Sequence, residues 1–332
     1  MSTIKYPKIS FIIPLLNEEK TIKNCLDSLF SLDYPKEKIE IVIAKGPSID
    51  NTNNILEEYV NKNNNIILLE NPTGNTSIGR NECIVHATGS MLMNYSGHVI
   101  AEKNLLKTLV AKLQSIPSDV AAVGCSNISP GKQNFVGEVS GVVFLSFMGG
   151  RNFFSQNAVL SEEKFVDHVS FALYRKEPVD KIGCFDPDFW CGQDYELDVR
   201  LRKAGYKILY TPNTHVYHFK RDSIRTLWRQ MYRYGIARAK IVKKHHNTLR
   251  YYYLLGPVFI FSSILLLLLT LLRFIPIWFI PLLVLIYVLM SFVSTLQVSK
   301  KLSVIVSSVI IYLVIHLGYG AGFIRGIFYS KL

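Results

Sequence analysis

Hydrophobic residues form two different patterns along this chain. Up to about residue 219, short apolar runs of strand length alternate with segments in which apolar residues recur at helical spacing. From residue 251 onward, three uncharged apolar runs follow one another, and each is long enough for a helix to cross a bilayer core, which takes about 20 residues. The pattern therefore predicts a polar α/β head, residues 1–219, and a membrane domain, residues 251–332, with spans near 251–272, 275–297 and 302–324.

The first half of the head predicts βαβ units. The expected strands are 9–16, 39–44, 65–69 and 90–95, and helical patterns near 22–30, 53–60 and 77–86 lie between them. This alternation indicates a mostly parallel sheet, in which ligands bind at the carboxyl ends of the strands. Those ends fall at Leu16–Glu18, Lys45–Asp50 and Tyr95–His98. No Gly-x-Gly-x-x-Gly and no Walker-type loop follows a strand, which argues against dinucleotide oxidoreductases and P-loop ATPases.

The second half of the head is less regular. Residues 126–167 contain many glycines and aromatic residues, and we interpret them as long connections that could cover an acceptor. The segment 185–208 then predicts a helix that begins near Asp194 and stops at Gly205. A carboxylate in the first turn lies at the positive end of the helix dipole, which keeps it ionised, as a general base or an electrostatic anchor requires. The alternative is that Asp194 and Glu196 simply cap this helix.

Charge is distributed unevenly along the chain. The sequence carries 37 Lys and Arg against 25 Asp and Glu, a net charge of +12. Residues 220–332 hold fifteen of the basic residues and a single acid, Asp222, which leaves residues 1–219 with a net charge of −2. Positive charge beside apolar runs fits anionic lipid headgroups better than nucleic acid. We expect membrane lipids as partners and no nucleic acid.

Residues 220–250 predict an amphipathic helix in the membrane interface. Apolar residues fall at helical spacing, and arginines recur every four residues beside them. The apolar set is Ile224, Leu227, Trp228, Met231 and Tyr232, and the basic set is Arg225, Arg229 and Arg233. The alternative is a solvated basic face whose apolar side packs on the head, and the two interpretations are compatible.

The basic residues also predict an orientation. The approach to the first span and the loop with Lys300 and Lys301 are basic, whereas Arg273 alone marks the opposite loop. The positive-inside rule then places the head on the cytoplasmic face of the cell membrane, as part of a multi-pass protein. The apolar run 9–16 is too short for a signal peptide. The five cysteines lack paired metal spacing, suit a reducing compartment and are interpreted as packing residues.

Several segments of the head resemble one large enzyme family when they are taken together and in order. They read SFIIPLLNEEKTIKNCLDSL, IVIAKGPSIDNT, Gly79-Arg80-Asn81, FVDHVSFALYRKEPVDKIGCFDPDF and GQDYELDVRLRKAGYKI. This order is similar to that of the family 2 inverting nucleotide-sugar glycosyltransferases, which have the GT-A fold. The subgroup it resembles most is the succinoglycan-type exopolysaccharide glucosyltransferases, and the likeness extends into WRQMYRYG and HLGYGAGFIRG.

The resemblance implies roles for four residues. Asp194 matches the general base that deprotonates the acceptor hydroxyl as it attacks the anomeric carbon. Arg80 matches an arginine near the donor pyrophosphate or base, Asp50 lies in the nucleotide-binding turn, and Glu18 lies where the family contacts the nucleoside. Such a single displacement needs one carboxylate as base and positive charge for the departing diphosphate.

The chain departs from the family pattern at two places. Lys45 stands where an aspartate usually contacts the nucleoside, and Ser96-Gly97-His98 replaces the acidic metal-binding motif. The family implies a divalent metal, Mg²⁺ or Mn²⁺, but a serine hydroxyl is a poor ligand for either ion. His98 remains as a weak metal ligand or a diphosphate contact, and the alternative is a hydrogen-bonded structural histidine.

Three explanations fit these departures. The donor diphosphate is neutralised by Lys45, Arg80, Arg229 or Arg233; or a metal binds weakly through His98 and the phosphates; or donor chemistry has been lost. The first two predict a membrane-anchored glycosyltransferase that moves a single sugar, with inversion, from a nucleotide-sugar to a polyprenyl phosphate- or diphosphate-linked acceptor. Its pathway would be cell-surface polysaccharide or glycan biosynthesis, with partner glycosyltransferases.

The third explanation predicts a catalytically impaired binding or assembly subunit of a glycan-synthesis complex. A transporter is disfavoured because the predicted spans carry no charged residue in their interiors and offer no obvious translocation path. His316, deep in the third span, is interpreted as an interhelical hydrogen-bonding residue. A processive polysaccharide synthase is also disfavoured, because three spans are too few to enclose a polymer channel.

Overall fold

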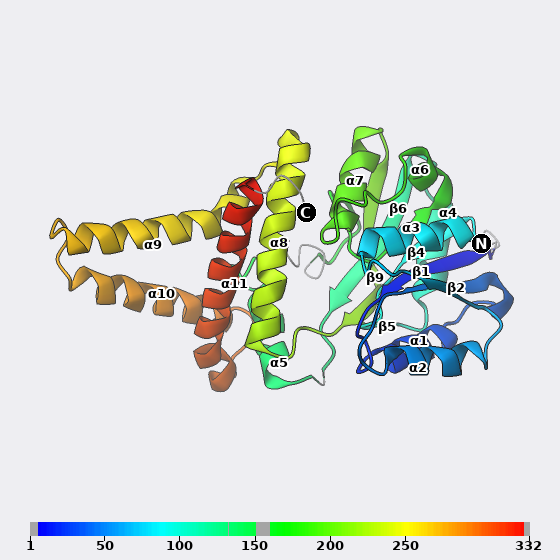
Figure 1. Ribbon diagram of the computed structural model, residues 1–332, viewed down its shortest axis with the longest axis horizontal. Helices are drawn as coiled ribbons and strands as arrows, with labels where there is room; N and C mark the ends of the chain where they lie inside the picture. Colours follow the sequence, from blue (N-terminus) through cyan, green and yellow to red (C-terminus); the bar gives the residue numbers. More distant parts are fainter. Residues whose placement is uncertain (1–5, 132, 151–159, 329–332) are drawn as a thin grey trace. The chain divides into compact units, whose positions relative to one another are not determined.

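The computed structural model describes residues 6–131, 133–150 and 160–328 (Figure 1). The chain divides into two compact units. The first unit comprises Met1–Ile128 and Leu160–His218, and the second comprises Ser129–Val159 and Phe219–Leu332.

The first unit is built on one mixed sheet, which has nine strands in the described residues. Eight strands follow one another in the order β3-β2-β1-β4-β8-β6-β9-β5, and β7 pairs with β9. The strands β1, β2, β3 and β4 are mutually parallel neighbours, whereas β8 is antiparallel to both β4 and β6. Their bounds are β1 Ile9–Leu15, β2 Ile39–Lys45, β3 Ile66–Glu70, β4 Met91–Asn94, β5 Val99–Ala101, β6 Val120–Ile128, β7 Lys164–Phe165, β8 Ala172–Arg175 and β9 Lys207–His218.

Helices cover both faces of this sheet because successive strand residues point to opposite sides. On β1, Phe11 and Ile13 belong to a core shared with α1, α2 and α4, whereas Ile12 belongs to a core shared with α3, α6 and α7. The bounds are α1 Ile22–Phe30, α2 Thr52–Val60, α3 Thr76–His86, α4 Leu105–Gln114, α6 Lys176–Lys181 and α7 Gln193–Lys203. The expected α/β head is therefore confirmed, with its early strands and helices close to the predicted bounds.

The segment 126–167 differs from the expected run of connections. It contains a helix, α5 Phe135–Leu145, which the contacts assign to the second unit and not to the head. Asn134 caps this helix by accepting a hydrogen bond from Gly137 N–H at 2.8 Å. Val139 and Val143 are buried in a core shared with the C-terminal helices. Gly137 and Gly141 lie within α5, and because glycine is unfavourable inside helices, the sequence did not predict this helix.

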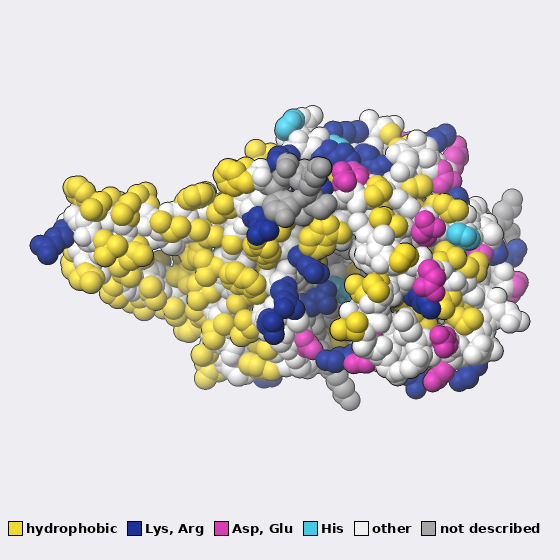
Figure 2. All heavy atoms as spheres, in the orientation of Figure 1, with side chains coloured by type: hydrophobic (Ala, Val, Ile, Leu, Met, Phe, Trp, Pro, Cys, Tyr) yellow, Lys and Arg dark blue, Asp and Glu magenta, His cyan; other side chains and the backbone are white. Residues whose placement is uncertain are grey.

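The second unit consists of α5 and four longer helices, α8 Ile224–Lys244, α9 Leu255–Leu271, α10 Phe279–Leu296 and α11 Leu302–Phe328. Three segments are long and apolar enough to cross a membrane, Tyr251–Leu271, Phe279–Leu296 and Leu302–Phe328. Hydrophobic side chains cover the outer surface of α9 and α10 in Figure 2. The three apolar helices expected from the sequence are therefore present, and half of the third is buried inside the protein.

α8 has the amphipathic pattern that its sequence predicts. Leu227 and Met231 are buried, whereas Arg225, Arg229 and Arg233 are exposed. Its buried side packs on α11 within the second unit, and a Cβ at Gly322 would overlap the backbone carbonyl of Tyr232, so only glycine allows this approach. The placement of α8 in a membrane interface stays a prediction.

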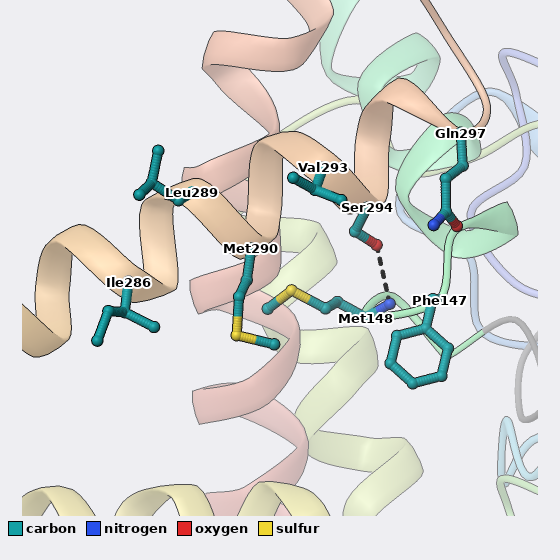
Figure 3. Close-up of a pocket in the computed structure, with 8 residues that line it drawn as sticks. All are labelled: Phe147, Met148, Ile286, Leu289, Met290, Val293, Ser294 and Gln297. Atoms are coloured by element: carbon teal, nitrogen blue, oxygen red, sulfur yellow. Dashed lines mark hydrogen bonds between the residues drawn. The ribbon is translucent and has the colours of Figure 1, made fainter.

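Polar groups link the segment after α5 to the apolar helices. His316 contacts Tyr287 OH through Nδ1 at 3.0 Å and the carbonyl oxygen of Met148 through Nε2 at 2.9 Å. Met148 N–H donates to Ser294 Oγ at 3.0 Å, as the dashed line in Figure 3 marks. Beside this bond, Phe147, Met148 and one face of α10 line an apolar groove of about 280 Å³. These contacts give His316 the interhelical hydrogen-bonding role that its position suggested.

Candidate active site

Five of the predicted donor-side residues lie at one edge of the sheet. Because β1, β2 and β4 are parallel neighbours, their carboxyl ends meet at the same edge. Glu18 follows β1. Lys45 is the last residue of β2 and Asp50 follows it, while Ser96 and His98 follow β4.

Glu18 and His98 are in direct contact at this edge. Glu18 Oε1 lies 2.8 Å from His98 Nδ1, and the Glu18 backbone N–H donates to Thr52 Oγ1 at 2.8 Å. Gly97 permits this approach, since a Cβ there would overlap Leu15 and lie 3.2 Å from Glu18 Cγ. The His98 ring also lies 5.0 Å from the ring of His218. The loop after β4 is therefore fixed against the loop after β1.

Asp50 joins the same network through Thr52. Its carboxylate accepts hydrogen bonds from Thr52 N–H at 3.1 Å and from Glu19 N–H at 3.2 Å, together with the Thr52 hydroxyl. Burial alone would raise the pKa of Asp50, but these donors outweigh it and lower the pKa below its ordinary value. The turn after β2 is thus held in one conformation by an ionised side chain.

Lys45 and Ser96 lie at the same edge with other partners. Lys45 Nζ forms an ion pair with Glu70 Oε1 at 3.0 Å, which joins the ends of β2 and β3. The Ser96 carbonyl oxygen accepts a contact from Cys25 Sγ at 3.5 Å. Two more of the predicted residues, Arg229 and Arg233, lie on the exposed side of α8 in the second unit.

Arg80 is brought to Asp194 by hydrogen bonds between α3 and the segment before α7. Asn75 caps α3 and donates through Nδ2 to the Pro187 carbonyl at 2.9 Å, while Asn81 exchanges hydrogen bonds of 2.7 and 2.9 Å with the Phe185 backbone. The Gly79-Arg80-Asn81 run therefore holds α3 against the segment before α7, in addition to the chemical role that the resemblance implies.

The start of α7 sets the position of Asp194. Gly192 precedes the helix with φ of 70°, a left-handed conformation that glycine adopts without strain. Glu196 is fully buried and pairs with Arg200 Nε at 2.8 Å, and Arg200 donates onward to the Ile182 carbonyl. Glu196 therefore forms a buried ion pair within α7, whereas Asp194, two residues earlier, forms no such pair with an arginine of this helix in the described contacts.

Asp194 is partly exposed, with 23% of its side chain accessible. Its Oδ1 accepts the Tyr195 backbone N–H at 2.9 Å, and its Oδ2 lies 3.7 Å from His168 Nε2. Arg80 interacts with it electrostatically. The arginine is only 4% exposed and its guanidinium lies 5.3 Å from the centre of the Phe185 ring.

The charge on Arg80 is poorly compensated. Burial lowers the pKa of its guanidinium, and the nearby Asp194 carboxylate opposes that shift. Within the described residues, Nε and Nη1 of Arg80 have no hydrogen-bond partner. A buried cation with unused donors beside a partly exposed carboxylate is an arrangement suited to an anionic ligand.

The sequence interpretation missed a second carboxylate–histidine contact beside Asp194. Asp198 is fully buried, and its Oδ2 lies 2.7 Å from His168 Nδ1. Its Oδ1 accepts a hydrogen bond from Tyr174 OH at 2.8 Å. A signal was present, because Asp194 and Asp198 are four residues apart on one helix face, where like charges repel unless a cation separates them.

The acidic metal motif has no substitute in the part of the chain that the structure describes. Among residues 6–131, 133–150 and 160–328, no group of three or more His, Cys, Asp or Glu side chains could hold a metal ion. The residues at the site therefore do not fit a divalent cation held by the protein alone.

The fold, together with the polar residues at the carboxyl ends of its parallel strands, indicates the class of protein. The chain is similar to the mannosyltransferase PcManGT from Pyrobaculum calidifontis, solved with GDP-Man and Mn²⁺, with a TM-score of 0.56 at 18% identity, covering 74% of this chain and 65% of that one. The first unit thus has the GT-A fold of nucleotide-sugar glycosyltransferases, as the sequence predicted.

The family follows from the sequence comparisons. The model of glycosyl transferase family 2 matches residues 10–183, and that of glycosyl transferase family group 2 matches residues 100–324. The chain therefore belongs to glycosyl transferase family 2 and is a glycosyltransferase.

Two curated relatives are similar over most of the chain. One is a dolichyl N-acetyl-alpha-D-glucosaminyl phosphate 3-beta-D-2,3-diacetamido-2,3-dideoxy-beta-D-glucuronosyltransferase of Methanococcus voltae, 31% identical over 77% of this chain and 80% of that protein. The other is the succinoglycan biosynthesis protein ExoA of Rhizobium meliloti (strain 1021), 28% identical over 70% of each. Several other relatives are longer, and the chain spans about half of their length.

Proposed function

We propose that this protein transfers a single sugar from a nucleotide-sugar to a lipid-linked acceptor, with inversion at the anomeric carbon. The observation that carries the proposal is the position of Asp194: a partly exposed carboxylate in the first turn of α7, beside the buried Arg80. A base must reach the acceptor hydroxyl, and this carboxylate is partly exposed at the positive end of the helix dipole with a cation beside it.

The proposed reaction is a single displacement. Asp194 takes the proton from the acceptor hydroxyl while that oxygen attacks the anomeric carbon. The bond from this carbon to the diphosphate breaks, and the diphosphate leaves with the electron pair. Positive charge near the leaving group stabilises it, and Arg80, whose Nε and Nη1 are unpartnered within the described residues, is the group we assign to this task.

The lipid-linked acceptor is inferred from two features. The relative from Methanococcus voltae is named for an acceptor that carries a dolichyl phosphate, and this chain has three helices able to cross a membrane. The exposed arginines of α8, Arg225, Arg229 and Arg233, suit anionic headgroups. By the positive-inside rule, the head lies on the cytoplasmic face.

We propose that donor binding depends less on a divalent metal than in family members with an acidic motif. Ser96 supplies no anionic ligand, and His98 is engaged by Glu18 at 2.8 Å. When a metal such as Mg²⁺ or Mn²⁺ binds in related enzymes, it neutralises diphosphate charge; here Arg80 and Lys45 are the cations that the first unit offers for that purpose.

A second candidate function is a binding or assembly subunit without transfer activity, together with partner glycosyltransferases. The replacement of the acidic motif by Ser96-Gly97-His98 and the pairing of Lys45 with Glu70 favour it. Calorimetry with a panel of nucleotide-sugars distinguishes the two functions. A transferase binds one donor selectively, whereas an impaired subunit binds none of them.

Transfer itself is tested with the purified protein in lipid vesicles. The reaction contains the donor selected by calorimetry and a polyprenyl diphosphate-linked saccharide as acceptor. We expect one sugar to be added, with the anomeric configuration opposite to that of the donor by NMR. A product with retained configuration, or selective donor binding without any transfer to lipid-linked saccharides, would overturn the proposal.

A further inference from the structure

His168 lies between two carboxylates of the same helix. Its Nδ1 is 2.7 Å from Asp198 Oδ2, and its Nε2 is 3.7 Å from Asp194 Oδ2. Asp198 is completely buried, whereas His168 and Asp194 are each about one fifth exposed. The imidazole therefore connects the interior of the first unit to the carboxylate that we assign as base.

The hydrogen-bonding capacity of the three groups indicates the charge on the ring. An ionised carboxylate only accepts hydrogen bonds, and a neutral imidazole has one donor nitrogen and one acceptor nitrogen. With the Nδ1 proton donated to Asp198, Nε2 lies 3.7 Å from Asp194 Oδ2, which is an ion-pair separation and not a hydrogen bond, and only the imidazolium form makes this contact attractive. The two negative charges stabilise that form, and Asp198 holds it in one orientation.

The remaining groups around His168 agree with this assignment. The Tyr195 ring packs edge-on at 5.4 Å, and Ser170 Oγ lies 3.5 Å from Nε2, where its hydroxyl accepts from a protonated ring or donates to a neutral one. Tyr174 donates to the other oxygen of Asp198, which leaves Oδ2 for the imidazole and for the Val169 N–H at 3.2 Å.

Two further charged side chains of the described residues lie near this group. Asp167, the residue before His168, pairs with Arg202 at 3.3 Å, so its charge is offset by a neighbour of opposite sign. The positive charge of Arg80, on α3, interacts electrostatically with the Asp194 carboxylate. Among the described contacts, the charges closest to the imidazole are the carboxylates of Asp194 and Asp198, which favour its protonated form.

We propose that His168, oriented by Asp198, is a positioning residue that holds the Asp194 carboxylate aimed at the acceptor hydroxyl. This inference rests on the proposed function. It assigns Asp198 and His168 to the chemical step and not to donor binding. When Asp194 receives the acceptor proton, the imidazolium remains paired with the Asp198 carboxylate, so no further proton has to move within the step.

The inference predicts that removing His168 lowers kcat and leaves the donor Kd nearly unchanged. His168→Asn should lower kcat by roughly tenfold to a hundredfold, the range seen when an orienting partner of a reactive group is removed. The donor Kd should change by less than about threefold, because neither His168 nor Asp198 is assigned to the donor. His86→Asn is the matched control, since His86 is exposed at the end of α3 and bonds only to Glu82 O in the described contacts.

The pH dependence of kcat distinguishes a His168 that positions Asp194 from a His168 that only supports the fold. In the native protein, kcat should fall at high pH as the imidazolium loses its proton. Asp198→Asn keeps the ring in place but removes a negative charge, so this alkaline limb should move to lower pH by about one unit or more. His168→Asn should have no such limb.

The double variant His168→Asn/Asp198→Asn is the control for misfolding, because it removes the buried carboxylate together with the imidazole that pairs with it. We expect it to remain folded, with kcat as low as that of His168→Asn and no alkaline limb. A double variant with kcat within about threefold of the native value, or an Asp198→Asn profile that coincides with the native one, would overturn the inference.

The failure of this inference is distinguishable from failure of the proposed function. If Asp194→Asn is inactive while His168→Asn keeps native kcat and pH profile, only the role of His168 is wrong. If Asp194→Asn is as active as the native protein, Asp194 is not the base and both are wrong.

Discussion

Replacing His168 with asparagine should destabilise the first unit through Asp198. The Asp198 carboxylate is fully buried and accepts hydrogen bonds from His168 Nδ1 at 2.7 Å, Tyr174 OH at 2.8 Å and Val169 N–H at 3.2 Å. The substitution removes the charged partner and leaves two neutral donors. Removing one partner of a buried ion pair typically costs about 3–5 kcal/mol, because the remaining charge is left in a medium of low polarity.

Two features of the site reduce that cost. The remaining hydrogen bonds are worth about 1 kcal/mol each, and Asp198 can accept a proton instead of staying charged. We therefore expect His168→Asn to lower the free energy of unfolding by about 2–4 kcal/mol at pH 8. In the double variant, the neutral amide oxygen introduced at position 198 accepts from Tyr174 and Val169. That variant should be within about 1 kcal/mol of Asp198→Asn alone, so the coupling between the two sites should be at least about 1 kcal/mol.

The pH dependence of this cost has a definite sign. Burial raises the pKa of Asp198 even in the presence of His168, although hydrogen bonds from His168 and Tyr174 oppose the shift. Without the imidazolium, the folded-state pKa rises further above the unfolded value. The folded state then binds the proton more tightly, so the stability of His168→Asn is greatest at low pH and is lost as the pH rises through the folded-state pKa. Its deficit should be smaller at pH 5 than at pH 8.

Chemical denaturation of the detergent-solubilised protein, followed by tryptophan fluorescence at both pH values, measures these quantities for the native protein, the two single variants and the double variant. A coupling below about 0.5 kcal/mol at pH 8 would refute the reasoning, as would a deficit that grows towards acidic pH.

Three other predictions follow from the same geometry. Gly97→Ala introduces a Cβ that overlaps Leu15 and crowds Glu18, so the unfolding free energy should fall by about 1–3 kcal/mol and donor affinity should fall with it, as thermal unfolding and calorimetry would show. Excess EDTA should lower sugar transfer by less than about tenfold, because no described side-chain cluster holds a metal. Iodoacetamide at pH 8 should spare the three buried thiols, since burial raises the pKa of the Cys83 and Cys125 thiols to about 12 and that of Cys25 higher still, and mass spectrometry should find label at Cys184 and Cys191.

Each of these has a clear contrary result. Native stability in Gly97→Ala would show that the loops after β1 and β4 are not packed as described. Complete loss of transfer in EDTA, restored by Mn²⁺, would show that the site requires a metal. Rapid labelling of Cys25 in the native protein would contradict its burial between α1 and the sheet.

The early strands were predictable because their residues are buried on both faces and form continuous apolar runs. Ile9–Leu15 and Ile39–Lys45 lie within about one residue of the expected bounds, and Gly205, with φ of 91°, ends the region of α7 as its position indicated. The helix α5 could not be predicted in the same way. Its glycines break the usual helical signal, and its apolar residues find their partners on α8 and α11, far away in the sequence.

The candidate site was predictable only in part, for a related reason. A single residue such as Asp194 or Glu18 is identified by where it stands relative to a strand or helix. The partners of those residues come from distant segments: His98 lies 80 residues from Glu18, and His168 lies 30 residues from Asp198. Pattern within a segment carries no information about such pairs, except for the repulsion implied by two acids on one face of α7.

The central claim is that Asp194 is the base in a sugar transfer, and one comparison tests it directly. Asp194→Asn and the exposed control Asp188→Asn are assayed for transfer to the lipid-linked acceptor at saturating donor, with the donor Kd measured on the same preparations. The account predicts that Asp194→Asn lowers kcat by about 10²–10⁴-fold while donor binding and folding are unchanged, and that Asp188→Asn behaves like the native protein. Native turnover in Asp194→Asn would contradict the account.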